Sequence, residues 1–131
     1  MQRTLAPGEA SPDAQCLAGH RERGDLSLFT VDARGEVQQR VVYDAAAGAL
    51  VDRPLRRFPG VPEAQACAVD DSAEALYIAE EPVGVWRYSA AWEGDREREP
   101  VLLGGAAGPL AGEATDLAVD GRGGLWVLDG D

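Results

Sequence analysis

The sequence contains no lysine, because all 12 of its basic residues are arginine. Any contact with phosphate must therefore use an arginine guanidinium or backbone N–H groups. Acidic residues outnumber basic ones by 23 to 12, and the formal net charge is −11. Nucleic acids and anionic membrane surfaces are bound through basic patches, so we expect neither as a partner. Cations such as calcium suit this charge balance better.

Cysteine and histidine are also scarce. Two cysteines, Cys16 and Cys67, and one histidine, His20, are too few for a disulfide-rich scaffold or a zinc site. His20 lies in a polar segment, where we expect a solvated turn residue. No apolar run approaches the ~20 residues of a membrane span. Residues 1–13 lack the apolar core of a signal peptide, so we expect either a cytoplasmic protein or a chain that starts after an export signal.

A repeat of about 50 residues is the strongest pattern in the sequence. Segments of alternating large apolar residues begin at Leu26, Leu76 and Leu125, which are 50 and then 49 residues apart. Each segment ends in an acidic residue, which is typical of a half-buried strand. The triplet at residues 16–18 takes the place of residues 67–69 upstream of the second segment.

Each of the first two repeats continues through a glycine turn into two further strands, at residues 35–43 and 53–58, and then at 84–88 and 100–103. Four short strands per repeat without a helical period are typical of a β-propeller blade. We therefore predict an all-β fold, a partial β-propeller of about two and a half four-stranded blades over residues 15–131. An irregular segment, residues 1–14, precedes it. Because propellers close with about 4–8 blades, we expect a fragment of a longer chain or a truncated gene product.

Residues 67–90 join an Asp-Asp turn, a Leu-Tyr-Ile-Ala-Glu-Glu strand and a Gly-Val-Trp-Arg-Tyr-Ser-Ala strand. This order resembles the β-propeller phytases, and the likeness extends back through residues 35–39 and 55–58. The resemblance implies a ring of six blades that binds several calcium ions and hydrolyses phosphate monoesters of phytate. It also implies a family that bacteria mostly export, so we expect a secreted or periplasmic protein.

The resemblance implies a site at one mouth of the ring. Calcium ions held by carboxylates would neutralise the phosphates of phytate and position a water for attack, while basic side chains hold the remaining phosphate oxygens. The candidate phosphate contacts are Arg40 and Arg57, and the sequence assigns no catalytic residue. The candidate calcium ligands are Glu80, Glu81, Glu93 and Glu113.

The sequence departs from the family where site residues are expected. Neutral residues replace three family acids, and proline replaces a phosphate-contacting lysine, while Arg40 stands where the family has a tyrosine. The neutral replacements keep at most an uncharged oxygen and so weaken calcium binding. The replaced positions are Pro59, Gln65, Ala91 and Thr115. We therefore expect weak calcium binding and no release of phosphate from phytate by this chain alone.

Two functions remain open. The first is a fragment of a phytase-like hydrolase that acts on phytate or another phosphorylated small molecule by calcium-assisted water attack. The alternative is a non-catalytic propeller segment, which acts as a binding or packing module beside a complete catalytic domain. In both cases we expect contacts with the missing blades or with a second propeller domain.

Further expectations concern residues outside this site. Cys16 and Cys67 hold the same place in neighbouring blades, and packed sheets lie about 10 Å apart. A disulfide needs Cα atoms within about 7 Å, so we predict two free, buried thiols. Strand-edge arginines such as Arg56 usually face water, and Asp70 and Asp71 are expected to stabilise a turn. The aromatic residues expected in the core between blades are Tyr77, Trp86, Tyr88 and Trp126.

Overall fold

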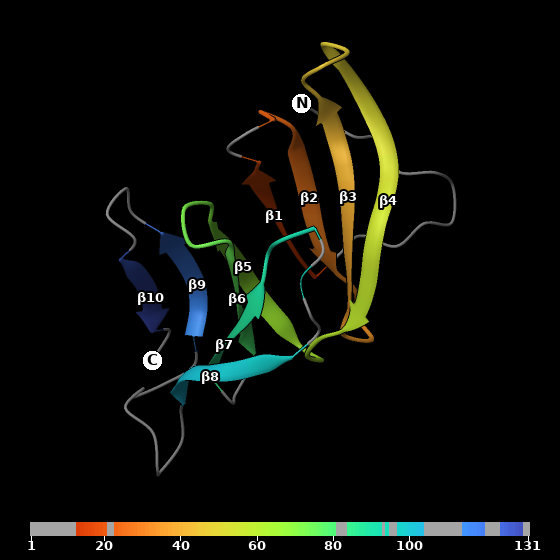
Figure 1. The fold of residues 1–131 in the computed structure, drawn as a ribbon. Coiled ribbons are helices and arrows are strands. Elements are labelled where there is room, and N and C mark those ends of the chain that lie inside the picture. The colour runs from red at the N-terminus through yellow and green to blue at the C-terminus, as the bar shows by residue number, and fades with distance from the viewer. Residues whose placement is uncertain are drawn as a thin grey trace.

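The computed structural model describes residues 13–20, 23–80, 84–92, 94, 97–103, 114–119 and 124–129. These residues form three antiparallel sheets that lie side by side in chain order (Figure 1). The first sheet contains, in spatial order, β1 (Ala14–Gly19), β2 (Leu26–Val31), β3 (Glu36–Asp44) and β4 (Ala49–Pro59).

The second sheet repeats this order, and the third has two strands in the described part of the chain. The second contains β5 (Ala64–Asp70), β6 (Ala75–Glu80), β7 (Gly84–Ser89) and β8 (Arg98–Leu103), and the third β9 (Ala114–Val119) and β10 (Leu125–Asp129). The described residues include no helix, and therefore none that is long and apolar enough to span a membrane.

The prediction of repeated blades is confirmed. β2, β6 and β10 are the second strands of three successive sheets. The first strands lie next to one another, because β5 contacts both β1 and β9, and the fourth strands lie at the far edge of their sheets (Figure 1). This is the arrangement of propeller blades around an axis, so the all-β, partial propeller is the observed fold.

The tight turn between β2 and β3 depends on Asp32 and Gly35. The Asp32 carboxylate accepts hydrogen bonds from the backbone N–H groups of Arg34 (2.9 Å) and Glu36 (3.0 Å). Gly35 follows with φ of 86°, and a Cβ there would lie 2.8 Å from backbone atoms of Val61 and Pro62. Glycine is therefore required both for the turn and for the close approach of the chain that leads into the second sheet.

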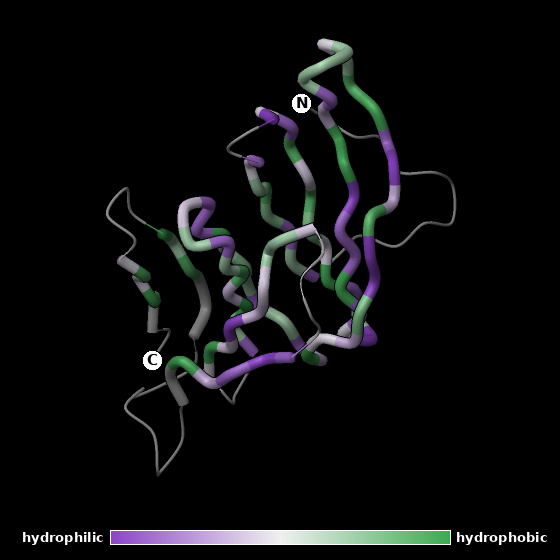
Figure 2. The backbone as a smooth tube through the Cα atoms, in the orientation of Figure 1, coloured by the Kyte–Doolittle hydropathy of each residue, from purple (hydrophilic) through white to green (hydrophobic). Residues whose placement is uncertain are grey.

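The described residues form two apolar cores between the sheets, and Figure 2 shows the apolar segments running along their strands. The core between the first and second sheets contains side chains that are at most 2% exposed, which are Phe29, Val31, Val37, Phe58, Val61, Leu76, Ile78 and Tyr88. The core between the second and third sheets contains Ala79, Val85 and Leu117, with Tyr77 packed against them.

The aromatic residues follow the prediction except for one. Tyr88 is buried, and Tyr77 and Trp86 are half-buried against the two cores. Trp126 is instead 66% exposed. Its prediction as a core residue was wrong, because it lies on the face of the third sheet that is turned away from the second.

Cys16 and Cys67 form a disulfide with a Cα–Cα distance of 5.8 Å. The prediction of two free, buried thiols was therefore wrong, and both residues are half-buried. Leu17 pairs with Leu28 and Cys67 pairs with Ile78, so Cys67 is the repeat equivalent of Leu17. Cys16 is one residue out of step, and one residue along a strand turns a side chain to the opposite face. It therefore points towards the second sheet, where β1 and β5 converge near the axis.

Candidate functional site

The antiparallel order gives the blades two ends. The end where β1, β5 and β9 begin is called the amino end here, and the end where they finish is called the carboxyl end. Glu80 closes β6 and Arg57 lies near the end of β4, so both are at the amino end. Arg40 lies inside β3, opposite Leu28 of β2.

Arg57 lines a hollow of about 480 Å³ at the amino end, which it shares with Arg34, Glu36 and Pro59. Its guanidinium lies 2.6 Å from the Glu36 carboxylate, and its side chain is 65% exposed. An ion pair this exposed is worth about 0.2–1 kcal/mol. A phosphate group with more negative charge than a carboxylate can therefore compete with Glu36 for Arg57.

Arg40 is held more tightly. Its Nε donates a hydrogen bond of 2.6 Å to Asp52 on β4, and its side chain is 28% exposed. Gln39, the preceding residue, faces the second sheet, where its amide donates to the backbone oxygen of Ala90. Because side chains alternate along a strand, Arg40 points away from the second sheet. Arg57 points the same way, because it lies opposite Gln38.

Glu80 belongs to the second sheet, and it lies on the opposite side of the first sheet from Arg40 and Arg57. It is 9% exposed, and its Oε1 accepts a hydrogen bond of 2.9 Å from the indole N–H of Trp86. It is two residues beyond Ile78, which faces the first sheet, so Glu80 faces that sheet as well. The structure therefore does not bring Glu80 together with Arg40 or Arg57.

The other candidate ligands, Glu81, Glu93 and Glu113, lie outside the described residues. Calcium takes 6–8 oxygen ligands. Within the part of the chain that the structure describes, no three His, Cys, Asp or Glu side chains gather in a group that could hold a metal ion. The described residues therefore do not by themselves fit a calcium site, and Glu80 alone would bring one carboxylate with one oxygen already bonded.

Trp86 and Tyr88 lie next to Glu80 on the same face of the second sheet. The guanidinium of Arg98 lies 4.1 Å from the centre of the Trp86 ring, where a cation–π contact is favourable. The Tyr88 hydroxyl is buried, and this burial raises the pKa of Tyr88 above its usual value, while the nearby Arg98 guanidinium lowers it by less. It stays protonated at neutral pH.

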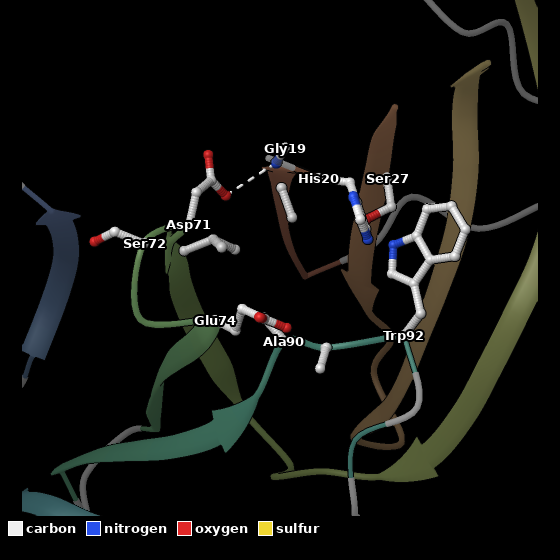
Figure 3. Close-up of a pocket in the computed structure, with 11 residues that line it drawn as sticks. Gly19, His20, Ser27, Asp71, Ser72, Glu74, Ala90 and Trp92 are labelled. Atoms are coloured by element: carbon white, nitrogen blue, oxygen red, sulfur yellow. Dashed lines mark hydrogen bonds between the residues drawn. The ribbon is translucent and has the colours of Figure 1, made fainter. Parts of the chain in front are cut away.

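A second hollow, of about 570 Å³, lies at the carboxyl end between the first and second sheets (Figure 3). His20 and Trp92 line one side of it, with their rings 5.2 Å apart. The His20 Nδ1 accepts a hydrogen bond from the backbone N–H of Arg23, whose guanidinium lies 5.1 Å from the Trp92 ring centre. His20 therefore lies in the turn that its polar neighbours predicted, but its ring is half-buried against Trp92 and not fully solvated.

Asp70 and Asp71 lie at this end and have structural roles. Asp71 accepts a hydrogen bond of 2.9 Å from the backbone N–H of Gly19, which ties the turn of the second sheet to β1 (Figure 3). Asp70 closes its own turn, and the Ser72 hydroxyl and the backbone N–H groups of Ala73 and Ser72 hold its pKa below the usual value. The expected turn role of Asp70 is therefore observed.

Sequence reasoning missed a buried brace between the first two sheets. Gln39 is 0% exposed, and its Oε1 accepts a hydrogen bond of 2.7 Å from Arg56. The same guanidinium donates to the backbone oxygens of Ser89 and Gly94 and lies 4.9 Å from the Phe58 ring centre. Arg56 therefore connects two blades instead of facing water. The available signal was Gln39 itself, a polar residue on a face whose neighbours are apolar, since buried polar groups have partners.

The comparison with known families agrees with this architecture. The chain matches the family described as Phytase over residues 17–123, a span that includes β2 to β9 and the strands that carry Arg57 and Glu80. Curated proteins give no match to the chain. The matched span covers most of the 131 residues and coincides with the repeated sheets, so the chain belongs to the β-propeller phytase family.

Proposed function

We propose that the chain is part of a hydrolase that uses calcium to cleave phosphate monoesters of phytate or of a similar phosphorylated small molecule. The observation that supports this proposal is the family match over residues 17–123. At the level of the family, the chain is a phytase-like hydrolase domain. The substrate, the cofactor and the activity of this particular chain are the proposed part.

For this chain alone we propose weak calcium binding and no turnover of phytate. The described charged side chains of the candidate site already have partners within the chain, which are Asp52 for Arg40, Glu36 for Arg57 and the indole of Trp86 for Glu80. The carboxylate count is reduced further by Gln65, Ala91 and Thr115. Calcium affinity falls as a site loses carboxylates.

Arg57 is the side chain with which we propose the chain holds phosphate. It is the more exposed of the two candidate arginines and lines a hollow that a phosphate group can enter. A guanidinium presents two parallel N–H groups to phosphate oxygens, which favours it over a single point charge. Its roles are binding and orientation of the substrate.

The second candidate function is a non-catalytic binding or packing module. The contacts between the sheets favour it, because the disulfide, the Arg56 brace and the bond from Gly19 to Asp71 all stabilise the packing of blades. These contacts give the described residues a well-packed scaffold, whereas the described acids form no cluster.

Export to an oxidising compartment is also part of the proposal. Disulfides persist in secreted and periplasmic proteins and are rare in the cytosol. The bond between Cys16 and Cys67 supports a secreted or periplasmic location, which agrees with the export expected from the family resemblance.

The test is phosphate release from phytate by the 131-residue chain, with and without millimolar calcium, together with calorimetric titration of calcium and of phytate. We expect calcium binding with a Kd near or above the 10⁻⁴–10⁻³ M range of weak sites, phytate binding, and no phosphate release. Calcium-dependent release would overturn the proposed inactivity and establish the hydrolase. Failure to bind phytate at all would favour the packing module.

A further inference from the structure

The hollow at the carboxyl end is separate from the candidate phosphate site, because Arg57 and Glu80 lie at the amino end. Its described walls are the ends of β1 and β5 with the turns that follow them, one residue of β2, and residues 90–92 (Figure 3). These walls all lie within residues 18–92, so the hollow involves neither end of the sequence. Its volume of about 570 Å³ lies in the range of about 300–1,000 Å³ that is usual for small-molecule sites.

The hollow exists because a small side chain, Ser27, occupies a place that a large one fills in the next sheet. Ser27 of β2 pairs with Ala18 of β1. The equivalent pair 50 residues later is Tyr77 with Ala68, and both pack towards the third sheet. Ser27 faces the second sheet, as Phe29 does two residues further along the strand. A serine is much shorter than a tyrosine, so the space beside it stays open.

The Ser27 hydroxyl supplies a hydrogen-bond donor to the hollow. The residue is 1% exposed, and its Oγ accepts a hydrogen bond of 3.1 Å from the side-chain amide of Gln39. A hydroxyl also has one proton to donate, and no described residue accepts the proton of Ser27. Because buried polar groups normally have partners, this O–H group indicates an acceptor that comes from outside the chain.

Two ring N–H groups lie on the same side of the hollow as Ser27 (Figure 3). The His20 Nδ1 accepts a hydrogen bond from the backbone N–H of Arg23, so the neutral imidazole carries its proton on Nε2. The second group is the indole N–H of Trp92. Among the described residues, neither ring N–H donates to an acceptor, and the contacts of the Trp92 ring are with His20 and the Arg23 guanidinium. This side of the hollow therefore presents hydrogen-bond donors.

Two carboxylates, Asp71 and Glu74, lie on the opposite side (Figure 3). Asp71 binds the backbone N–H of Gly19 through Oδ1, which leaves its Oδ2. Neither carboxylate forms an ion pair within the described residues, so a cation is the favoured occupant. The described His, Cys, Asp and Glu side chains do not gather in a group of three that could hold a metal ion. An organic cation fits this side better.

The backbone of Glu74 is strained where it presents this carboxylate. Its φ is 50°, in the left-handed region that favours glycine. Gly24, which holds the same place 50 residues earlier in the first sheet, has φ of 77°. The first sheet therefore uses glycine for this turn, whereas the second retains a side chain there. Strain of this kind is typical of residues whose side chain serves a function.

We propose that the hollow binds a small hydroxylated ammonium compound, the chemistry of an amino sugar. The ammonium group lies between Asp71 and Glu74, where charge-assisted hydrogen bonds to carboxylates are strong. The hydroxyl oxygens accept hydrogen bonds from the donors on the opposite side. A phosphorylated ligand would be repelled by the two carboxylates, so this ligand differs in kind from the substrate proposed for the amino end.

The test is calorimetric titration of glucosamine, and separately of glucose, into the 131-residue chain at neutral pH. Glucose has a hydroxyl where glucosamine has its amine. We expect a Kd of about 1 mM or lower for glucosamine and binding at least about tenfold weaker for glucose. Glu74→Gln keeps the shape of the side chain without its charge and should weaken glucosamine binding about tenfold. Trp92→Phe keeps the ring but removes the N–H, and should weaken it about threefold.

Glu74→Gly separates the binding role from folding. Glycine relieves the strain at φ of 50°, so the thermal unfolding midpoint should be unchanged or higher while glucosamine binding is lost. Glu63→Gly is the matched control, because Glu63 is an exposed glutamate with φ of 56° that precedes β5 at the amino end. This variant should also stay folded, but it should bind glucosamine as the wild type does.

Three results would overturn the proposal. The first is no binding of glucosamine by the wild-type chain, and the second is equal binding of glucosamine and glucose. The third is equal weakening by Glu63→Gly and Glu74→Gly, which would show only a general attraction of a cation to a chain of net charge −11. None of these results bears on the proposed hydrolase, because phosphate binding and release are assigned to the amino end.

Discussion

Cys16 of β1 and Cys67 of β5 are joined by a disulfide between the innermost strands of two neighbouring blades. The bond spans 51 residues, one more than the 50 that separate Leu26 from Leu76. That single extra residue sets the two sulfur atoms on facing sides of their strands. If the two cysteines were 50 residues apart, they would hold equivalent places in their blades, and their side chains would point the same way around the propeller axis instead of towards each other.

Loss of this disulfide should destabilise the fold. A closed loop of about 50 residues restricts the unfolded chain by about 4 kcal/mol in the loop-entropy treatment. We expect the urea midpoint of the oxidised protein to fall on addition of dithiothreitol, with a loss of about that size in the free energy of unfolding. The double variant Cys16→Ser, Cys67→Ser is the control and should be insensitive to the reductant. An equal midpoint for oxidised and reduced wild-type protein would show that the bond does not stabilise the fold.

The strands were predictable because their pattern is local. Alternating large apolar residues and glycine turns recur at Leu26, Leu76 and Leu125, and each pattern folds as the strand that it indicates. The disulfide was not predictable by the same means. Its geometry depends on the register in which each strand pairs with its neighbour. An error of one residue in that register assigns every side chain to the wrong face of the sheet.

The candidate site was less predictable than the fold. Glu80 was recognised from its motif, but its bond to Trp86 depends on where the indole of the next strand points. Arg56 and Arg57 are adjacent in sequence, yet one is enclosed between two sheets and the other lines an open hollow. Adjacent side chains on a strand point to opposite faces of the sheet, so the two environments can be told apart only when the face that packs on the neighbouring sheet is known.

This pair of arginines offers a matched test of the buried brace. Arg56→Ala leaves the side-chain Oε1 of Gln39 without this partner inside the core. The loss of a charged hydrogen bond to a buried group costs about 2–3 kcal/mol. Arg57→Ala removes only an exposed pair with Glu36, and should cost less than about 1 kcal/mol. Chemical unfolding of the two variants measures the difference. Equal effects would mean that Arg56 does not brace the blades.

The acid sensitivity of the fold should depend in part on Asp70. The hydroxyl of Ser72 and nearby backbone N–H groups hold the pKa of Asp70 below the unfolded value of 3.8. The ionised form is therefore the one that stabilises the native state, and this contribution is present above pH 3.8 and is lost as the pH falls through the lower native pKa. Asp70→Asn should flatten the fall in unfolding free energy below about pH 4. Asp71→Asn is the control, and an identical pH profile for Asp70→Asn and wild type would contradict the turn role.

Phosphate recognition should separate Arg57 from Arg40. Arg57 lines the hollow at the amino end with an exposed and weakly paired guanidinium, whereas Arg40 is bound to Asp52 and is less exposed. Arg57→Ala should weaken phytate binding about tenfold, the effect of one charge-assisted hydrogen bond, while Arg40→Ala should leave it within about twofold. Calorimetric titration of phytate into the folded variants at low salt measures both constants, and Arg57→Lys tests whether a point charge suffices. If Arg40→Ala weakens binding more than Arg57→Ala does, phosphate is held inside the sheet and not in the hollow that Arg57 lines.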